Sequence, residues 1–119
     1  MSDKSKIDTR SFDFSVRIIK LCRFIDNLSA TDRVLAKQLL RSGTSIGANT
    51  AEAQAAQSKP DFIAKMSIAS KEARETLYWL RLIKETSSIP EDKLSDIIQE
   101  ATELCAIITS IVKTSKENL

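Results

Sequence analysis

The segment Arg41-Ser-Gly-Thr-Ser-Ile-Gly-Ala-Asn-Thr-Ala-Glu-Ala53 contains the only two glycines of the chain, Gly43 and Gly47. The residues around them favour a helix, in which each glycine costs about 1 kcal/mol relative to alanine. Because residues four apart share a helix face, the two glycines form a smooth strip that Ala51 and Ala55 extend. The strip predicts close packing against a second helix, either of the same bundle or of a neighbouring subunit.

Apolar residues with helical spacing extend outward from this segment over four stretches of the chain. Their intervals of three and four place them on one face of each helix. Ser29 or Thr31 is expected to cap the second helix. Ser58 and Ser88 each precede a proline by two residues, and we expect them to cap the third and fourth helices. The expected core positions are Phe14, Ile18, Leu21, Ile25 and Leu28; Leu35, Leu39, Ser42, Ile46, Asn49 and Ala53; Phe62, Met66, Ala69, Ala73, Thr76, Leu80 and Ile83; and Leu94, Ile97, Ala101, Leu104, Ile108 and Ile111.

The predicted fold is all-α, an antiparallel up-and-down four-helix bundle. Short connections between long helices make sequential neighbours antiparallel. With two prolines and two glycines, the chain has little turn-forming material for a many-stranded β fold. Residues 1–10 are mostly polar, and we expect them to form a flexible N-terminus. Residues 11–117 are then the single bundle domain.

The residue types that usually carry catalysis are scarce. The chain has no histidine, which is the commonest general base and a usual metal ligand. Cys22 and Cys105 are isolated on apolar stripes. Glu72 and Glu75 resemble half of a carboxylate metal site, but the histidine that such bundles place one turn away is missing. We therefore expect no catalytic residue, no metal site and no cofactor, and the sequence does not favour an enzyme.

The sequence also predicts where the protein resides. No apolar run approaches the roughly 20 residues that span a bilayer. The first residues, Met-Ser-Asp-Lys-Ser-Lys, lack the apolar region of a signal peptide. We expect a cytoplasmic protein with no membrane partner.

Charge is unevenly distributed along the chain. Residues 1–87 contain 15 Lys and Arg against 10 Asp and Glu, whereas residues 88–119 contain 3 against 6. The basic part places Arg10, Arg17, Lys20 and Arg23 on one side of the first helix, and Arg33, Lys37 and Arg41 at intervals of four on the second. These positions favour either a polyanion-binding surface or an ordinary solvated one. The candidate nucleic-acid-binding residues are Arg17, Lys20, Arg33, Lys37 and Arg41.

Polar and aromatic side chains near the expected interior are candidates for fixing helix pairing. Asn49 and Glu52 would engage the third helix and set its register, unless they lie at an exposed edge. Tyr78 and Trp79 are adjacent, so they cannot both point inward, and one is expected in the core and the other at an interface. The expected partners of Asn49 and Glu52 are Lys71, Arg74 and Tyr78. The candidate packing or oligomer residues are Gly43, Gly47, Asn49, Glu52, Tyr78 and Trp79.

Several segments, in order and at their spacing, resemble a known family. They are Arg41 to Ala53, Asp61-Phe62, Ser67-Ile-Ala-Ser-Lys-Glu-Ala73 and Glu75-Thr-Leu-Tyr-Trp-Leu80. The chain resembles, from about Phe12 to Val112, the bacterial four-helix-bundle proteins related to those encoded in intervening sequences of large-subunit (23S) ribosomal RNA genes. The resemblance implies a ring-like homopentamer. The chain is also similar to the accessory variability determinant of diversity-generating retroelements, a basic pentamer that binds nucleic acid and a reverse transcriptase.

Together these observations predict a non-enzymatic, homo-oligomeric bundle, a pentamer by resemblance, that serves as an accessory or scaffold protein. Its expected partners are copies of itself, RNA or DNA on its basic surface, and a reverse transcriptase or other protein. This chain is only weakly basic, with a net charge of +2. The alternative is therefore a protein–protein adaptor or structural oligomer with no nucleic-acid binding.

Overall fold

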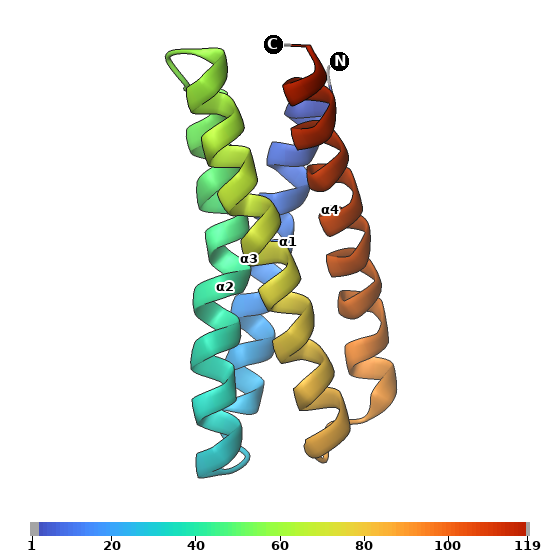
Figure 1. The fold of residues 1–119 in the computed structure, drawn as a ribbon. Coiled ribbons are helices and arrows are strands. Elements are labelled where there is room, and N and C mark those ends of the chain that lie inside the picture. Colours follow the sequence, from blue (N-terminus) through green and yellow to red (C-terminus); the bar gives the residue numbers. More distant parts are fainter. Residues whose placement is uncertain (1–2, 119) are drawn as a thin grey trace.

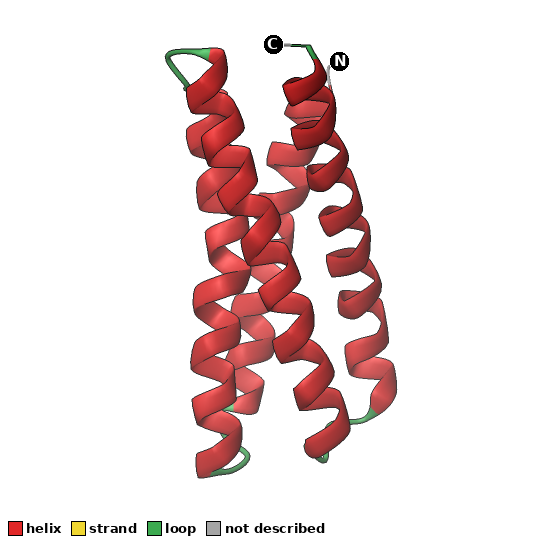
Figure 2. Ribbon diagram, viewed as in Figure 1, coloured by secondary structure: helices red, strands yellow, loops and turns green. Residues whose placement is uncertain are grey.

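Four long helices joined by short loops make up the described part of the chain, residues 3–118, in a computed structural model (Figure 2). The helices are α1 (Asp3–Ile25), α2 (Ala30–Gln54), α3 (Lys59–Thr86) and α4 (Glu91–Glu117). Sequential helices run antiparallel, and both chain ends lie at the same end of the bundle (Figure 1). Residues 3–118 contain no strand, so the all-α up-and-down bundle predicted from the sequence is confirmed.

Each helix packs against two neighbours in the order α1, α2, α3, α4, and α4 returns to α1. The α1–α4 contact is the least extensive of the four. The elongated bundle measures 47 × 21 × 21 Å. Large side chains that are fully buried run along its axis. They are Ile7, Phe14, Ile18, Ile25, Leu39, Ile46, Met66, Leu80, Ile83, Leu94, Leu104 and Ile108.

Serine caps begin two of the helices as the sequence predicts. Ser29 Oγ accepts a hydrogen bond from the Asp32 amide, and Ser58 Oγ accepts one from the Asp61 amide, each at 3.1 Å. The predicted Ser88 cap of α4 is wrong. Pro90 itself occupies the cap position and makes no side-chain cap bond, because its extended backbone (φ −55°, ψ 138°) leads directly into the helix.

The first helix begins earlier than the sequence predicts. From Asp3 onward, the expected flexible segment 1–10 is helical, and Ile7 is only 1% exposed. Ile7 lines a groove with Ile107 and Ile111, so α4 supplies the apolar partner that stabilises these turns of α1. Met1 and Ser2 lie outside the described residues.

The inner faces differ from expectation at a few helix positions. Leu28 is exposed because α1 ends at Ile25, so Leu28 lies in the following turn. On α2 the buried polar residue of the last turns is Thr50, whereas Asn49 is only half-buried.

None of the described helices has the length and apolarity needed to cross a membrane.

Candidate nucleic-acid interface

The glycine strip faces α1 of the same chain. A Cβ atom on Gly43 would lie 2.9 Å from two side-chain carbons of Ile18. A Cβ atom on Gly47 would lie 2.9 Å from Ser15 Oγ and 3.2 Å from the backbone oxygen of Ser11. All of these distances are shorter than ordinary van der Waals contacts. The two glycines therefore serve close α1–α2 packing within one bundle.

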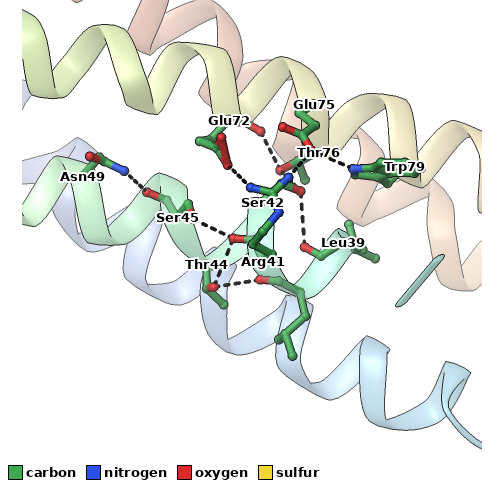
Figure 3. Close-up of polar contacts among 11 residues, drawn as sticks. Leu39, Arg41, Ser42, Thr44, Ser45, Asn49, Glu72, Glu75, Thr76 and Trp79 are labelled. Atoms are coloured by element: carbon green, nitrogen blue, oxygen red, sulfur yellow. Dashed lines mark hydrogen bonds and ion pairs between the residues drawn. The ribbon is translucent and has the colours of Figure 1, made fainter. Parts of the chain in front are cut away.

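A polar cluster connects α2 to α3 halfway along the bundle (Figure 3). The hydroxyl groups of Ser42 and Thr76 hydrogen-bond at 3.0 Å and are fully buried. Beside them, Arg41 donates to Glu72 Oε2 at 3.0 Å and also to Glu75 Oε1. Trp79 Nε1 donates to the same Glu75 oxygen at 3.2 Å. These bonds fix the register of α2 against α3.

This cluster changes the interpretation of Arg41 and of the Glu72–Glu75 pair. The Glu72 side chain is only 8% exposed, and it is compensated by the guanidinium group of Arg41. Arg41 is therefore paired with two carboxylates of its own chain. Among the described residues, no group of three or more Cys, Asp or Glu side chains is arranged to hold a metal ion.

Asn49 does not engage α3 as the sequence suggests. Its amide donates to the Ser45 carbonyl of its own helix at 2.8 Å (Figure 3). Glu52 is exposed. Trp79 packs against the core, whereas Tyr78 is exposed, and the two rings meet edge to face with centroids 5.2 Å apart. Ser42 and Thr76 thus perform the register role that was expected of Asn49 and Glu52.

Arg10 is also neutralised within the bundle. It donates to Glu100 at 2.6 Å and to Glu103 at 3.1 Å, which connects α1 to α4. The hydrogen bond to Glu100 raises the pKa of the Arg10 guanidinium. This leaves four of the candidate cations, Arg17, Lys20, Arg33 and Lys37. Within residues 6–118, where side chains are described, none of these four takes part in an ion pair.

Two of these cations line a depression between α1 and α4, which we call the α1–α4 notch. Arg17, Lys20 and Phe24 are on successive turns of one α1 face. Lys93, from the first turn of α4, places its Nζ 5.4 Å from the centre of the Phe24 ring. The phenyl ring is 42% exposed. The lining residues are Arg17, Lys20, Leu21, Phe24, Lys93 and Ile97.

The other two cations line a groove on the opposite flank of α1, between α1 and α2. Arg33 and Lys37 lie one turn apart on α2, and Arg23 adds a third positive charge from α1. Asp26 is the acidic residue of this lining. The lining of this α1–α2 groove is Ile19, Cys22, Arg23, Asp26, Arg33, Ala36, Lys37 and Leu40.

Cys22, in the floor of the groove, is not poised for reaction. Its Sγ donates to the Ala36 carbonyl at 3.4 Å. Desolvation by burial raises the pKa of Cys22 to about 11, so the thiol is protonated at neutral pH. Cys22 therefore contributes to the floor as a small apolar side chain.

Neither Phe24 nor Lys93 is among the core, packing or nucleic-acid-binding residues predicted from the sequence. Lys93 belongs to the net-acidic part of the chain, and only the return of α4 to α1 brings it beside Arg17 and Lys20. The exposed phenyl ring beside cations had no sequence signature of its own.

A family model matches residues 3–110 of this chain, and its description is "23S rRNA-intervening sequence protein". The chain belongs to this family. A solved structure from Bacteroides thetaiotaomicron, described as a protein with unknown function from the S23 ribosomal protein family, shares 44% sequence identity. It matches with a TM-score of 0.87 over 94% of this chain and 99% of that chain. Comparison with curated proteins found no match. Family membership is thus shown, and neither description names an activity.

Proposed function

We propose that this 23S rRNA-intervening sequence protein is a non-enzymatic, homo-oligomeric accessory or scaffold protein that contacts RNA or DNA through α1 and α2. The observation that carries the proposal is the difference between two kinds of cation. Arg10 and Arg41 are paired with carboxylates of the bundle, whereas Arg33 and Lys37 are exposed and available. Available cations that share a surface are what phosphate contacts require.

The same surface supports self-association. Phe12 is 67% exposed on α1, and Val16, one turn later, is also exposed. Leu40 is exposed on the neighbouring α2. Exposed apolar side chains on adjacent helices are typical of interaction surfaces. In a closed ring of identical subunits, five by resemblance, the few cations of each chain would be repeated by symmetry and would form a larger positive field.

The alternative function is a protein–protein adaptor or structural oligomer with no nucleic-acid affinity. The weakly basic net charge of +2 and the exposed Tyr78 and Ile68 of α3 favour it. A reverse transcriptase or another protein would then be the main partner. The two functions differ in whether nucleic acid binds at all and in how that binding responds to salt.

Fluorescence anisotropy with dye-labelled RNA and DNA tests the proposal. At about 50 mM salt the protein should bind the labelled RNA and DNA. The logarithm of the association constant should fall linearly with the logarithm of the salt concentration, because binding releases counterions from the phosphates. Replacing Arg33 and Lys37 together by glutamate should abolish binding. The matched control replaces the exposed Lys113 and Lys116 of α4 by glutamate, which makes the same charge change at the other end of the bundle. Equal losses in both variants, or no binding by the unaltered protein, would contradict the proposal.

Sedimentation velocity tests self-association separately. The protein should sediment as a single species larger than 13.2 kDa. Phe12→Ser should shift it toward the monomer, because it removes the large apolar side chain that is most exposed among the described residues. A protein that remains monomeric at all concentrations would leave the scaffold role without support.

A further inference from the structure

The α1–α4 notch combines features that nucleic-acid phosphates alone would not need. Three cations, Arg17, Lys20 and Lys93, line it together with Phe24, and Lys93 lies against the Phe24 ring. None of the six lining residues is acidic. The notch is a shallow, open depression with a volume of about 320 Å³.

We propose that this notch is a subsite for one unpaired nucleotide, with the base stacked on Phe24 and its phosphate held by Arg17, Lys20 and Lys93. The inference rests on the proposed nucleic-acid function and specifies it as recognition of single strands. A duplex keeps its bases stacked inside and presents mainly phosphates and groove edges. An unpaired base can turn outward and stack on an aromatic ring.

Lys93 does not prevent a base from stacking on Phe24. Its ammonium group lies 5.4 Å from the centre of the Phe24 ring at a partly exposed site. Stacking of a base is stronger than an exposed cation–π interaction, and the long lysine side chain can move from the ring to the phosphate. A base that stacks on Phe24 would replace the Lys93 ammonium group on the ring. The ammonium group would then donate a charge-assisted hydrogen bond to the phosphate of the same nucleotide.

The position of the notch suits a strand that continues onto the rest of the basic surface. The α1–α2 groove, with Arg33 and Lys37, lies on the other flank of the same helix. Lys20 and Arg23 project from α1 between the two depressions. A single strand that crosses α1 would therefore meet cations along its path, with one base anchored at Phe24.

The test compares affinities for about 12 nucleotides of oligouridylate, the same length of oligothymidylate, and an RNA duplex of matching length. Phe24→Leu keeps an apolar side chain but removes the aromatic face. It should weaken binding to both single strands about ten-fold and leave duplex binding within about two-fold. Phe24→Trp should retain single-strand affinity. Tyr78→Leu is the matched control, because Tyr78 is an exposed aromatic residue outside the notch.

Several outcomes would overturn the subsite. Unchanged single-strand affinity of Phe24→Leu would exclude stacking on this ring. An equal loss for the duplex, or an equal loss in Tyr78→Leu, would indicate a general effect on the fold or assembly. Circular dichroism and sedimentation of each variant establish that the bundle is intact. Binding that never depends on Phe24 removes the subsite alone, whereas no binding of any probe by the unaltered protein removes both proposals.

Discussion

Ser42 of α2 and Thr76 of α3 join their hydroxyl groups at 3.0 Å in the fully buried centre of the bundle (Figure 3). Thr76 Oγ1 also lies 2.7 Å from the Glu72 carbonyl, so the pair is connected to the backbone of α3. Each hydroxyl group would be costly to bury without a partner. The pair therefore holds α2 and α3 in one relative position.

A double-mutant cycle measures this connection. Thr76→Val and Ser42→Ala should each lower the free energy of unfolding by about 1–3 kcal/mol, because each leaves a buried polar group with fewer partners. The double variant should lose less than the sum of the two, with a coupling of about 1 kcal/mol. Urea unfolding at one fixed protein concentration provides the measurement, since self-association would shift the apparent stability. Additive losses would indicate that the two hydroxyl groups act independently.

Gly43 and Ile18 provide a second test, this time of α1–α2 packing. Gly43→Ala adds helix propensity but places a Cβ atom 2.9 Å from two carbons of the buried Ile18 side chain. Overpacking of this kind should lower stability by about 1–3 kcal/mol despite the better propensity. Combining it with Ile18→Ala should cost less than the sum of the single changes, because the space vacated by Ile18 accommodates the new methyl group. A more stable Gly43→Ala protein in thermal unfolding would show that α1 adjusts without strain.

The sequence predicted the helices and most of their inner faces because these depend on local spacing. All seven positions expected for the core of α3, from Phe62 to Ile83, are buried. It could not predict which cations are neutralised. Arg41 contacts Glu72 and Glu75, which are 31 and 34 residues away, and those contacts depend on how α2 and α3 are rotated about their axes.

The beginning of α1 shows a related limit. Residues 3–10 look like a polar tail in isolation, because a short helix gains little from local interactions. Ile7 becomes part of the core only because α4 extends to Glu117 and lies beside it. The notch around Phe24 likewise needs Lys93, which no local pattern connects to α1. Features that depend on two distant helices were therefore missed, whereas most features within one helix were predicted, the α4 cap being an exception.

Comparing Arg41→Gln with Lys37→Gln tests whether Arg41 stabilises the bundle while Lys37 binds nucleic acid. Arg41→Gln leaves the nearly buried Glu72 carboxylate without its guanidinium partner and should lower stability by about 1–2 kcal/mol. The loss stays below that of a fully buried pair because the Arg41 side chain is 49% exposed. RNA affinity should remain within about two-fold. Lys37→Gln should do the opposite, weakening RNA binding without loss of stability.

Urea unfolding and anisotropy on the same two proteins decide between these roles. If Arg41→Gln weakened RNA binding as much as Lys37→Gln while the fold remained stable, Arg41 would belong to the nucleic-acid surface. The assignment made from its ion pairs with Glu72 and Glu75 would then be wrong.

The raised pKa of the Cys22 thiol leads to two predictions. One concerns the reactivity of the two cysteines, and the other concerns how stability depends on pH. Burial raises its pKa from an ordinary 9.0 to about 11 in the folded chain. Iodoacetamide at neutral pH should therefore modify the half-buried Cys105 before Cys22.

As pH rises above 9.0, the unfolded chain loses the Cys22 proton first, so the free energy of unfolding should fall between pH 9.0 and about 11. Below pH 9.0 this contribution is fully present. Cys22→Ala is the control, because it keeps the lysine titrations of the same pH range and lacks the thiol. A stability that declines equally in both proteins would show that the Cys22 thiol ionises as readily in the bundle as in the unfolded chain.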